Sequence, residues 1–249
     1  TIDPINDVPE LVISNQETNE EASFTLTVSG TDVDTGTGPG DENILSYSAV
    51  SSSSDVSVSM GGDQLTMTPV LNFHGDVPIT VTVEDDGGLS YDEIFVLTVK
   101  PINDAPVIDA VAENLYTDED ISDTLSVSGS DVDHGTHNPG DENILTFSAI
   151  SSDTTLVKVE IDNPGGGEGE IIFDVQQDQY GSADITVIIS DDGGLSDSTE
   201  TTLTIYPVND APVIATLQDT ITDEEVPLTI IFSASDVEGD SLTLSAVSY

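Results

Sequence analysis

The sequence contains no cysteine and no tryptophan, and its 249 residues include only two cationic side chains, Lys100 and Lys158. Without cysteine, the chain can form no disulfide, hold no thiolate-bound metal and use no thiol nucleophile. Nucleic-acid binding needs cations that neutralise phosphates, so we expect no nucleic-acid partner. An anionic membrane surface would repel the chain, and no apolar run approaches the ~18 residues of a membrane span. We therefore expect no direct membrane insertion.

Negative charge, by contrast, is abundant, because 49 aspartates and glutamates give a formal net charge of −47. Combined with a hydrophobic fraction of 36%, this charge places the composition near the border of intrinsic disorder. Such a chain either stays unfolded or recruits cations that offset the repulsion between its carboxylates. The ordered repeats described next favour the second outcome.

Several short motifs recur in one order, which indicates an internal repeat. A Pro-x-Asn-Asp-x-Pro segment begins at Pro4, Pro101 and Pro207, so the spacings are 97 and 106 residues. In both complete repeats it is followed by Asp-Val-Asp, by Pro-Gly-Asp-Glu-Asn-Ile-Leu and by Asp-Asp-Gly-Gly-Leu-Ser. We predict a linker stub at 1–8, repeats at 9–104 and 105–210, and the start of a third repeat at 211–249.

Within a repeat, apolar residues alternate with polar ones, as Ile79, Val81 and Val83 do. A period of two marks strands with one buried face. In the first repeat we expect strands near 10–14, 23–29, 44–50, 55–60, 64–69, 77–84 and 92–99. Seven strands in about 100 residues predict an all-β, immunoglobulin-like β-sandwich. Residues 163–169 of the second repeat are expected to form a lengthened hairpin loop.

Acidic residues concentrate in the turns and linkers. The turn acids are Asp32, Asp34, Asp41, Glu42, Asp85 and Asp86 in the first repeat and Asp131, Asp133, Asp141, Glu142, Asp191 and Asp192 in the second, and each linker adds Asn-Asp. Two carboxylates ~5 Å apart repel by roughly 3 kcal/mol at an effective dielectric of ~20, so several pairs rival the stability of a domain. A divalent cation removes this repulsion, and calcium accepts six to eight oxygen ligands.

Two interpretations of these acids are open. Asp-Gly and Asn-Asp are ordinary turn chemistry, and a single Asp-x-Asp in a loop is more often solvated than metal-bound. Three acidic motifs recur together at matching offsets, however, and alternate residues of an extended segment point to one side. Calcium near the linkers is therefore the preferred interpretation, ahead of magnesium, which requires stricter octahedral geometry. Scattered acids such as Glu113 and Glu200 are expected to be solvated surface.

The motifs resemble the cadherin pattern, and more closely the cadherin-like tandem repeats of large bacterial surface or secreted adhesins. The resemblance rests on Asp-x-Asp, a Gly/Pro loop and Leu45-Ser-Tyr-Ser48, and on Asp-Asp-Gly-Gly-Leu-Ser followed by a strand and the linker motif. It implies tandem Greek-key β-sandwich domains arranged end to end, with calcium ions at the junctions. It also implies that the chain is an extracellular or cell-surface extender of an adhesin, with a role in cell adhesion and biofilm formation. The extender would be a monomeric rod in which neighbouring repeats of the same chain contact one another.

Carried over residue by residue, the resemblance implies three sets of calcium ligands. The half-site at the start would use Asn6, Asp7, Asp32, Asp34, Asn43 and Asp85; the first full junction Glu20, Asn103, Asp104, Asp131, Asp133, Asn143 and Asp191; and the second junction Glu119, Asn209, Asp210, Asp236, and Glu238 or Asp240. The Asp-Arg-Glu segment of cadherins has no counterpart, since residues 72–75 and 179–181 occupy that region without arginine. We therefore expect one or two ions per junction.

Other functions remain open at this point. The same sandwich is also suited to a carbohydrate- or protein-binding module of a secreted protein. In an adhesin, by contrast, a surface glycan or protein ligand would be bound through other domains. Against a binding module, no exposed aromatic platform is expected, since Tyr47, Phe73, Phe147 and Tyr180 are assigned to the core. A further alternative is the acidic surface of a halophile's protein with no specific metal.

An enzyme is not expected. Adjacent carboxylates such as Asp85 and Asp86 suit a glycosidase, but the pair recurs in both complete repeats, whereas an active site usually occurs once. The sequence has no Gly-x-Ser-x-Gly, phosphate loop or His-Glu-x-x-His motif. His134 and His137 lie in an acidic loop and are expected to be exposed turn residues.

Overall fold

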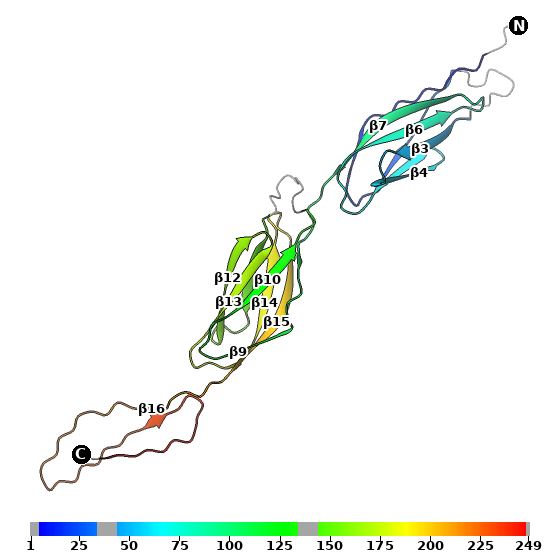
Figure 1. Ribbon diagram of the computed structural model, residues 1–249. Coiled ribbons are helices and arrows are strands. Elements are labelled where there is room, and N and C mark those ends of the chain that lie inside the picture. Colours follow the sequence, from blue (N-terminus) through cyan, green and yellow to red (C-terminus); the bar gives the residue numbers. More distant parts are fainter. Residues whose placement is uncertain (1–4, 34–43, 134–143, 248–249) are drawn as a thin grey trace. The chain divides into compact units, whose positions relative to one another are not determined.

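The computed structural model describes residues 5–33, 44–133 and 144–247, and the chain divides into two compact units, residues 1–103 and 104–249. In the described residues the regular elements are all β-strands (Figure 1). None of these residues belongs to a helix long and apolar enough to cross a membrane. Residues 211–249 fall within the second unit, so the repeat boundaries at 104 and 210 stay predictions.

Unit 1 (residues 1–103) is a sandwich of two sheets. The first has the order β1-β7-β6-β3, with β1 at Gln16–Asn19, β7 at Ser90–Lys100, β6 at Gly75–Glu84 and β3 at Ser46–Ser51. The second has the order β2-β5-β4, with β2 at Phe24–Thr27, β5 at Gln64–Pro69 and β4 at Val56–Gly61. The pairing of β1 with β7 is parallel, and the other named pairs of unit 1 are antiparallel.

Unit 2 (residues 104–249) repeats this plan. One sheet has the order β11-β14-β15-β9, with β11 at Thr146–Ser151, β14 at Gly181–Ser190, β15 at Ser196–Tyr206 and β9 at Asn114–Asp118. The other has the order β12-β13-β10-β8, with β12 at Val157–Gly165, β13 at Glu168–Val175, β10 at Asp123–Ser130 and β8 at Val107–Ile108. β9 runs parallel to β15, as β1 does to β7. Two short strands, β16 (Val213–Ile214) and β17 (Ala234–Ser235), then pair with each other.

The cores follow from the period-two pattern. On β6, Val77, Ile79, Val81 and Val83 are all buried, and the residues between them lie on the opposite face. In unit 2, Phe147 lies in a core cluster that joins residues from both sheets. Each fully buried aliphatic or aromatic side chain contributes about 1.5–3 kcal/mol relative to exposure. The alternation thus accounts for the two-layer architecture, and the all-β prediction is confirmed.

Gly129 allows close packing between strands of unit 2. A Cβ atom at this position would lie 2.7 Å from the carbonyl oxygen of Val107 and 2.6 Å from Cδ1 of Ile189. Both separations are shorter than real Cβ contacts, so only glycine lets β8 pair with β10 here while Ile189 stays in the core.

The first predicted strand is misplaced. Residues 10–14 form only an isolated bridge from Glu10 to Thr31, whereas β1 begins at Gln16. Leu11 is buried and Ile13 packs against the core, so these two residues contribute to core packing without pairing in a ladder. The polar sequence of β1 pairs with β7 through its backbone, which leaves no apolar alternation to detect.

The lengthened loop predicted at 163–169 is also wrong, because the extra residues extend the two strands of a hairpin. β12 continues to Gly165 with a register shift after Asp162, and β13 begins at Glu168. Gly166 and Gly167 alone connect the strands, with φ of 71° and 76°. Two consecutive positive φ angles suit a tight hairpin turn, which glycine forms without strain.

One aromatic residue assigned to the core is exposed. Phe147 is buried, and Tyr47 and Phe73 pack against the core of unit 1, but 49% of Tyr180 is exposed. Aligning Gly75 with Gly181 shows that Tyr180 corresponds to His74 rather than to Phe73. Both residues lie just before a strand, β6 or β14, and an offset of one residue in extended chain turns a side chain to the opposite side, which explains the error.

Candidate metal centre

Three carboxylates from distant parts of unit 2 converge where β9 and β15 end. Glu119 follows β9, Asp210 lies in the segment after β15, and Glu238 follows β17. One oxygen atom from each lies within 4.8 Å of the others. Two oxygens bound to one calcium ion at about 2.4 Å can lie at most about 4.8 Å apart. The group is therefore compact enough to share one ion.

Backbone hydrogen bonds orient these carboxylates. Glu119 is only 1% exposed, and its Oε1 accepts a hydrogen bond from the Val208 N–H at 2.7 Å. The Glu119 N–H donates to the carbonyl oxygen of Tyr206 at 2.9 Å, so main chain and side chain both bind the same segment. The Asp210 N–H donates to Oε2 of Glu238 at 3.0 Å. Each glutamate thus accepts a hydrogen bond from the segment after β15 through one of its two carboxylate oxygens.

The second carboxylate oxygen of each glutamate and Oδ2 of Asp210 differ from the oxygens that accept these hydrogen bonds. Glu119 Oε2, Asp210 Oδ2 and Glu238 Oε1 are buried and have no hydrogen-bond partner within the described residues. A buried polar atom without a partner is costly, and a buried charge is costlier still. A hard cation that takes oxygen ligands would supply what all three atoms lack. The donor set therefore fits calcium.

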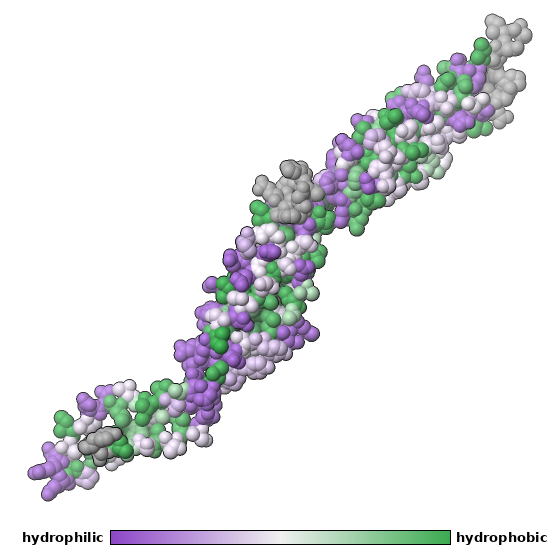
Figure 2. Space-filling model, in the orientation of Figure 1, coloured by the Kyte–Doolittle hydropathy of each residue, from purple (hydrophilic) through white to green (hydrophobic). Residues whose placement is uncertain are grey.

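A second acidic group adjoins the first and shares Asp210. Oxygens of Asp120, Asp178 and Asp210 also lie within 4.8 Å of one another. The Asp178 N–H donates to Oδ1 of Asp120 at 3.2 Å, and both residues have positive φ, 62° and 56°. Hydrophilic residues gather where β9 and β15 end, as the purple surface in Figure 2 shows. Sequence reasoning missed both Asp120 and Asp178.

The crowding of carboxylates changes the titration of Asp210. Burial raises the pKa of this side chain above its ordinary value, and the nearby carboxylates of Asp178, Glu238, Asp120 and Glu119 raise it further. Because the charged form of Asp210 is disfavoured in this way, a divalent cation bound nearby would stabilise its ionised carboxylate.

The other residues predicted for this junction lie outside both acidic groups. Oδ1 of Asp236 accepts a hydrogen bond from the Asp240 N–H at 3.0 Å, which closes the turn after β17. The side-chain amide of Asn209 is exposed and donates to the carbonyl oxygen of Asp210 at 3.1 Å. The structure therefore brings together Glu119, Asp210 and Glu238, whereas Asp236 and Asp240 belong to neither acidic group and Asn209 is exposed.

The residues predicted for the first junction repeat these local contacts within their own units. In unit 1, Oε1 of Glu20 accepts a hydrogen bond from the Ile102 N–H at 2.5 Å, as Glu119 does from Val208. In unit 2, the Asp104 N–H donates to Oδ2 of Asp133 at 2.7 Å, as Asp210 does to Glu238. The half-buried Asn103 is the last residue of unit 1.

The remaining residues of this set also lie in unit 2. Oδ1 of Asp131 accepts a hydrogen bond from the Asp133 N–H at 2.9 Å. Oδ1 of the buried Asp191 accepts one from the Leu195 N–H at 2.8 Å. Asn143 lies outside the described residues.

The half-site predicted at the start of the chain is ordered in part. The Asn6 side chain donates to Oδ2 of the buried Asp85 at 3.1 Å. A Cβ atom at Gly87 would lie 2.5 Å from the Asn6 amide nitrogen, so the glycine makes room for this contact. Asp7 is exposed and Asp32 is half-buried. Asp34 and Asn43 lie outside the described residues.

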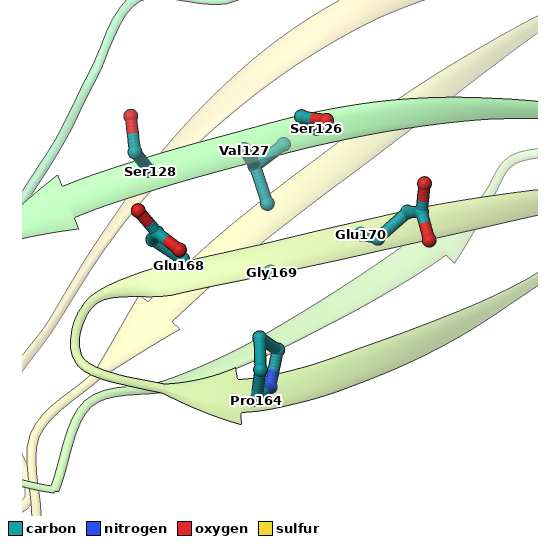
Figure 3. Close-up of a pocket in the computed structure, with 7 residues that line it drawn as sticks. All are labelled: Ser126, Val127, Ser128, Pro164, Glu168, Gly169 and Glu170. Atoms are coloured by element: carbon teal, nitrogen blue, oxygen red, sulfur yellow. The ribbon is translucent and has the colours of Figure 1, made fainter.

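A separate surface feature is a shallow groove of about 440 Å³ on unit 2. Figure 3 shows Ser126 and Ser128 on β10 beside Glu168 and Glu170 on β13, with Pro164 on the neighbouring β12. None of the predicted calcium ligands among the described residues lines it. The exposed carboxylates here follow the two-residue period of the outer face, which is typical of a solvated strand.

Comparison with known proteins supports the architecture. The family model described as a bacterial Ig domain matches residues 6–98. Structures of protocadherin gamma B2 extracellular cadherin domains 1–5 and 3–6 each match with a TM-score of 0.54 and 16% identity, covering 84% and 92% of this chain. Domains 3–6 of protocadherin gammaB7, from a cis-dimer structure, match with a TM-score of 0.54 and 18% identity over 93% of this chain.

The match covers 41%, 55% and 56% of those three structures, so the chain spans about half their length. No curated protein matches the chain significantly. At these identities the likeness shows the fold. Residues 6–98 thus match the bacterial Ig domain model, and the chain has the cadherin-like β-sandwich fold, which agrees with the resemblance inferred from the motifs.

Proposed function

We propose that this chain is a calcium-binding extender of a bacterial extracellular adhesin, in which ions bound beside the linkers stiffen the array of repeats. The observation that carries this proposal is the convergence of three buried carboxylate oxygens, on Glu119, Asp210 and Glu238. Within the described residues these oxygens have no hydrogen-bond partner, and they lie close enough together to share one ion.

The donor chemistry favours calcium over other metals. All three donors are carboxylate oxygens, whereas zinc and copper sites usually include nitrogen or sulfur ligands. Magnesium requires near-ideal octahedral geometry and keeps several waters, while calcium accepts six to eight oxygens in a flexible arrangement. Backbone carbonyls and water would complete the coordination. A net charge of −47 also raises the local concentration of cations.

Stiffening follows from where the ligands come from in the sequence. Glu119 belongs to the second predicted repeat, Asp210 to the linker, and Glu238 to the start of the third predicted repeat. One ion bound to all three would hold these segments in a single geometry. Because the unfolded chain cannot present the same ligand set, the binding free energy would favour only the assembled state. Asp120 and Asp178 would give a second ion its ligands beside Asp210.

We extend the same role to Glu20, Asp104 and Asp133 by repeat equivalence, since their sequence positions match those of Glu119, Asp210 and Glu238. A calcium-stiffened, monomeric array would hold a distal ligand-binding domain away from the cell. Its place would be outside the cell, where calcium reaches millimolar concentration and would complete folding after secretion.

Calcium titration calorimetry of the whole chain tests the proposal. The test variant combines Glu119→Gln, Asp210→Asn and Glu238→Gln, and the matched control combines Glu113→Gln, Asp162→Asn and Glu200→Gln, which remove the same charge from exposed positions. We expect the test variant to bind one or two fewer calcium ions and the control to bind as the parent does. Equal calcium binding by all three proteins would refute the proposal.

Two further measurements separate calcium-specific stiffening from a general salt effect. Small-angle scattering of the whole chain should show a narrower distribution of dimensions in calcium than in chelator. Molar KCl without calcium should not reproduce this narrowing. If KCl replaces calcium fully, the acidic residues act as a halophilic surface and not as specific ligands.

A further inference from the structure

The outer face of the sheet β11-β14-β15-β9 carries an exposed pair of stacked tyrosines. The ring centroids of Tyr116 on β9 and Tyr206 on β15 lie 6.0 Å apart, with an angle of 10° between the ring planes. Tyr116 is 59% exposed and Tyr206 is 49% exposed. Tyr180 is also about half exposed and directly precedes Gly181, which pairs with Ile205 on β15. The face therefore presents aromatic rings to solvent, contrary to the expectation from sequence.

Polar side chains adjoin the tyrosines on the same face. In register, Thr204 lies between Ser182 on β14 and Tyr116 on β9. One row further, Thr202 lies between Asp184 and Asn114. The hydroxyls of Ser182 and Thr204 are 3.1 Å apart, and the Thr202 hydroxyl donates to Oδ1 of Asp184 at 2.9 Å. We call the residues Tyr116, Tyr180, Ser182, Asp184, Thr202, Thr204 and Tyr206 the tyrosine face.

Unit 1 shows that the fold does not need tyrosines at these positions. There Thr98 on β7 pairs with Glu17 on β1, as Thr204 pairs with Tyr116 in unit 2. Lys100, two residues further along, makes an ion pair with Glu17. Unit 1 thus joins the parallel strands β1 and β7 with an ion pair, whereas unit 2 joins β9 and β15 with two solvent-exposed rings. Exposed tyrosines of this kind are enriched where proteins bind partners.

We propose that the tyrosine face binds a neutral polysaccharide, so that the extender itself adheres in addition to any distal domain. A flat sheet face with aromatic rings can stack on the C–H face of a sugar ring, because both surfaces are apolar and rigid. Hydroxyl and carboxylate groups beside the rings can exchange hydrogen bonds with sugar hydroxyls. The tyrosine face contains no cationic side chain, and the net charge of −47 disfavours anionic polymers.

Affinity electrophoresis of the whole chain tests this proposal, with gels that contain laminarin, galactomannan, dextran or hydroxyethylcellulose, and alginate as the anionic comparison. The test variant is Tyr116→Glu with Tyr206→Lys, which reproduces the ion pair of unit 1 and so keeps the strands joined. The matched control is Tyr91→Glu, at an exposed tyrosine of unit 1. Thermal unfolding confirms that each variant is folded.

We expect at least one neutral polysaccharide to retard the parent and the Tyr91 variant, and the double variant to bind about tenfold more weakly or worse. The proposal is overturned if no neutral polysaccharide retards the chain, or if the folded double variant binds as the parent does. It is also overturned if the parent self-associates in sedimentation and the double variant does not, since the face would then bind a second copy. None of these outcomes depends on the calcium ligands, so the result is independent of the proposed extender function.

Discussion

Replacing Glu119 with glutamine would separate the role of its charge from the role of its hydrogen bond. Oε1 of Glu119 accepts from the Val208 N–H at 2.7 Å, and the amide oxygen of glutamine can accept the same bond. The substitution therefore leaves the local fold intact and removes only negative charge. Without calcium, the variant loses repulsion with Asp210 and Glu238, so its melting temperature should stay the same or rise. With calcium, it loses a charged ligand, so its melting temperature should fall.

The size of the fall in calcium follows from binding linkage. One site at a free calcium concentration of 100 times its dissociation constant stabilises the fold by about 2.7 kcal/mol. If the variant binds about 100-fold more weakly, the same calcium concentration gives only about 0.4 kcal/mol. The loss of about 2.3 kcal/mol corresponds to roughly 9–18 °C for a domain of about 60–100 residues.

Differential scanning calorimetry of the whole chain in excess calcium and in chelator would measure both effects, with Glu113→Gln as the control at an exposed glutamate. If Glu119 binds calcium, the melting temperature of the variant should fall in calcium and should stay the same or rise in chelator. A fall of equal size in calcium and in chelator would show that Glu119 acts only through packing and hydrogen bonding. An unchanged melting temperature in calcium would show that it binds no ion.

Three further predictions follow from the same structure. Burial and acidic neighbours raise the pKa of Asp210, so the calcium-free fold takes up a proton as the pH falls from neutral through that raised pKa, and its stability should increase there. Melting curves against pH should show this increase in the parent and a smaller one in Asp210→Asn. Calcium affinity, measured by titration, should fall over the same pH range. Phe147→Ala should lower the free energy of unfolding by about 3–5 kcal/mol, measured by urea denaturation, because the ring is fully buried between the sheets of unit 2; a loss below about 1 kcal/mol would contradict this packing. Gly129→Ala should lower the free energy of unfolding by about 1–3 kcal/mol in the same assay, since the new Cβ would lie 2.7 Å from the Val107 carbonyl oxygen. Gly61→Ala, with open space around it, should lower it much less. Equal losses would show that the contact at Gly129 is relieved without strain.

Much of the fold could be predicted from side-chain alternation, because the period of two reports directly which face of a strand is buried. Ile79, Val81 and Val83 illustrate this, since all three were expected on one face and all three are buried. β1 could not be found in this way. Its residues Gln16–Asn19 are polar and pair with β7 through backbone hydrogen bonds, which do not depend on hydrophobic side chains.

The candidate site was accessible in part. Glu119, Asp210 and Glu238 were expected as ligands from the resemblance of their motifs, and the structure brings them together. Asp120 and Asp178 escaped notice because their proximity to Asp210 depends on two turns with positive φ. Sequence spacing gives no measure of such turns. The sequence did offer one indication of this group: Asp178 stands three residues before Gly181, whereas the first repeat has Asn72 three residues before Gly75.

The parallel pairing of β1 with β7 in unit 1 and of β9 with β15 in unit 2 determines how each sandwich responds to pulling. Tension applied at the start of β9 and at the end of β15 acts along the two strands in opposite directions, so it loads their ladder in shear. The register pairs from Asn114 with Thr202 to Asp118 with Tyr206 must then yield together, instead of opening one after another as in an unzipped hairpin. Each unit should consequently resist tensile force far better than its modest size suggests.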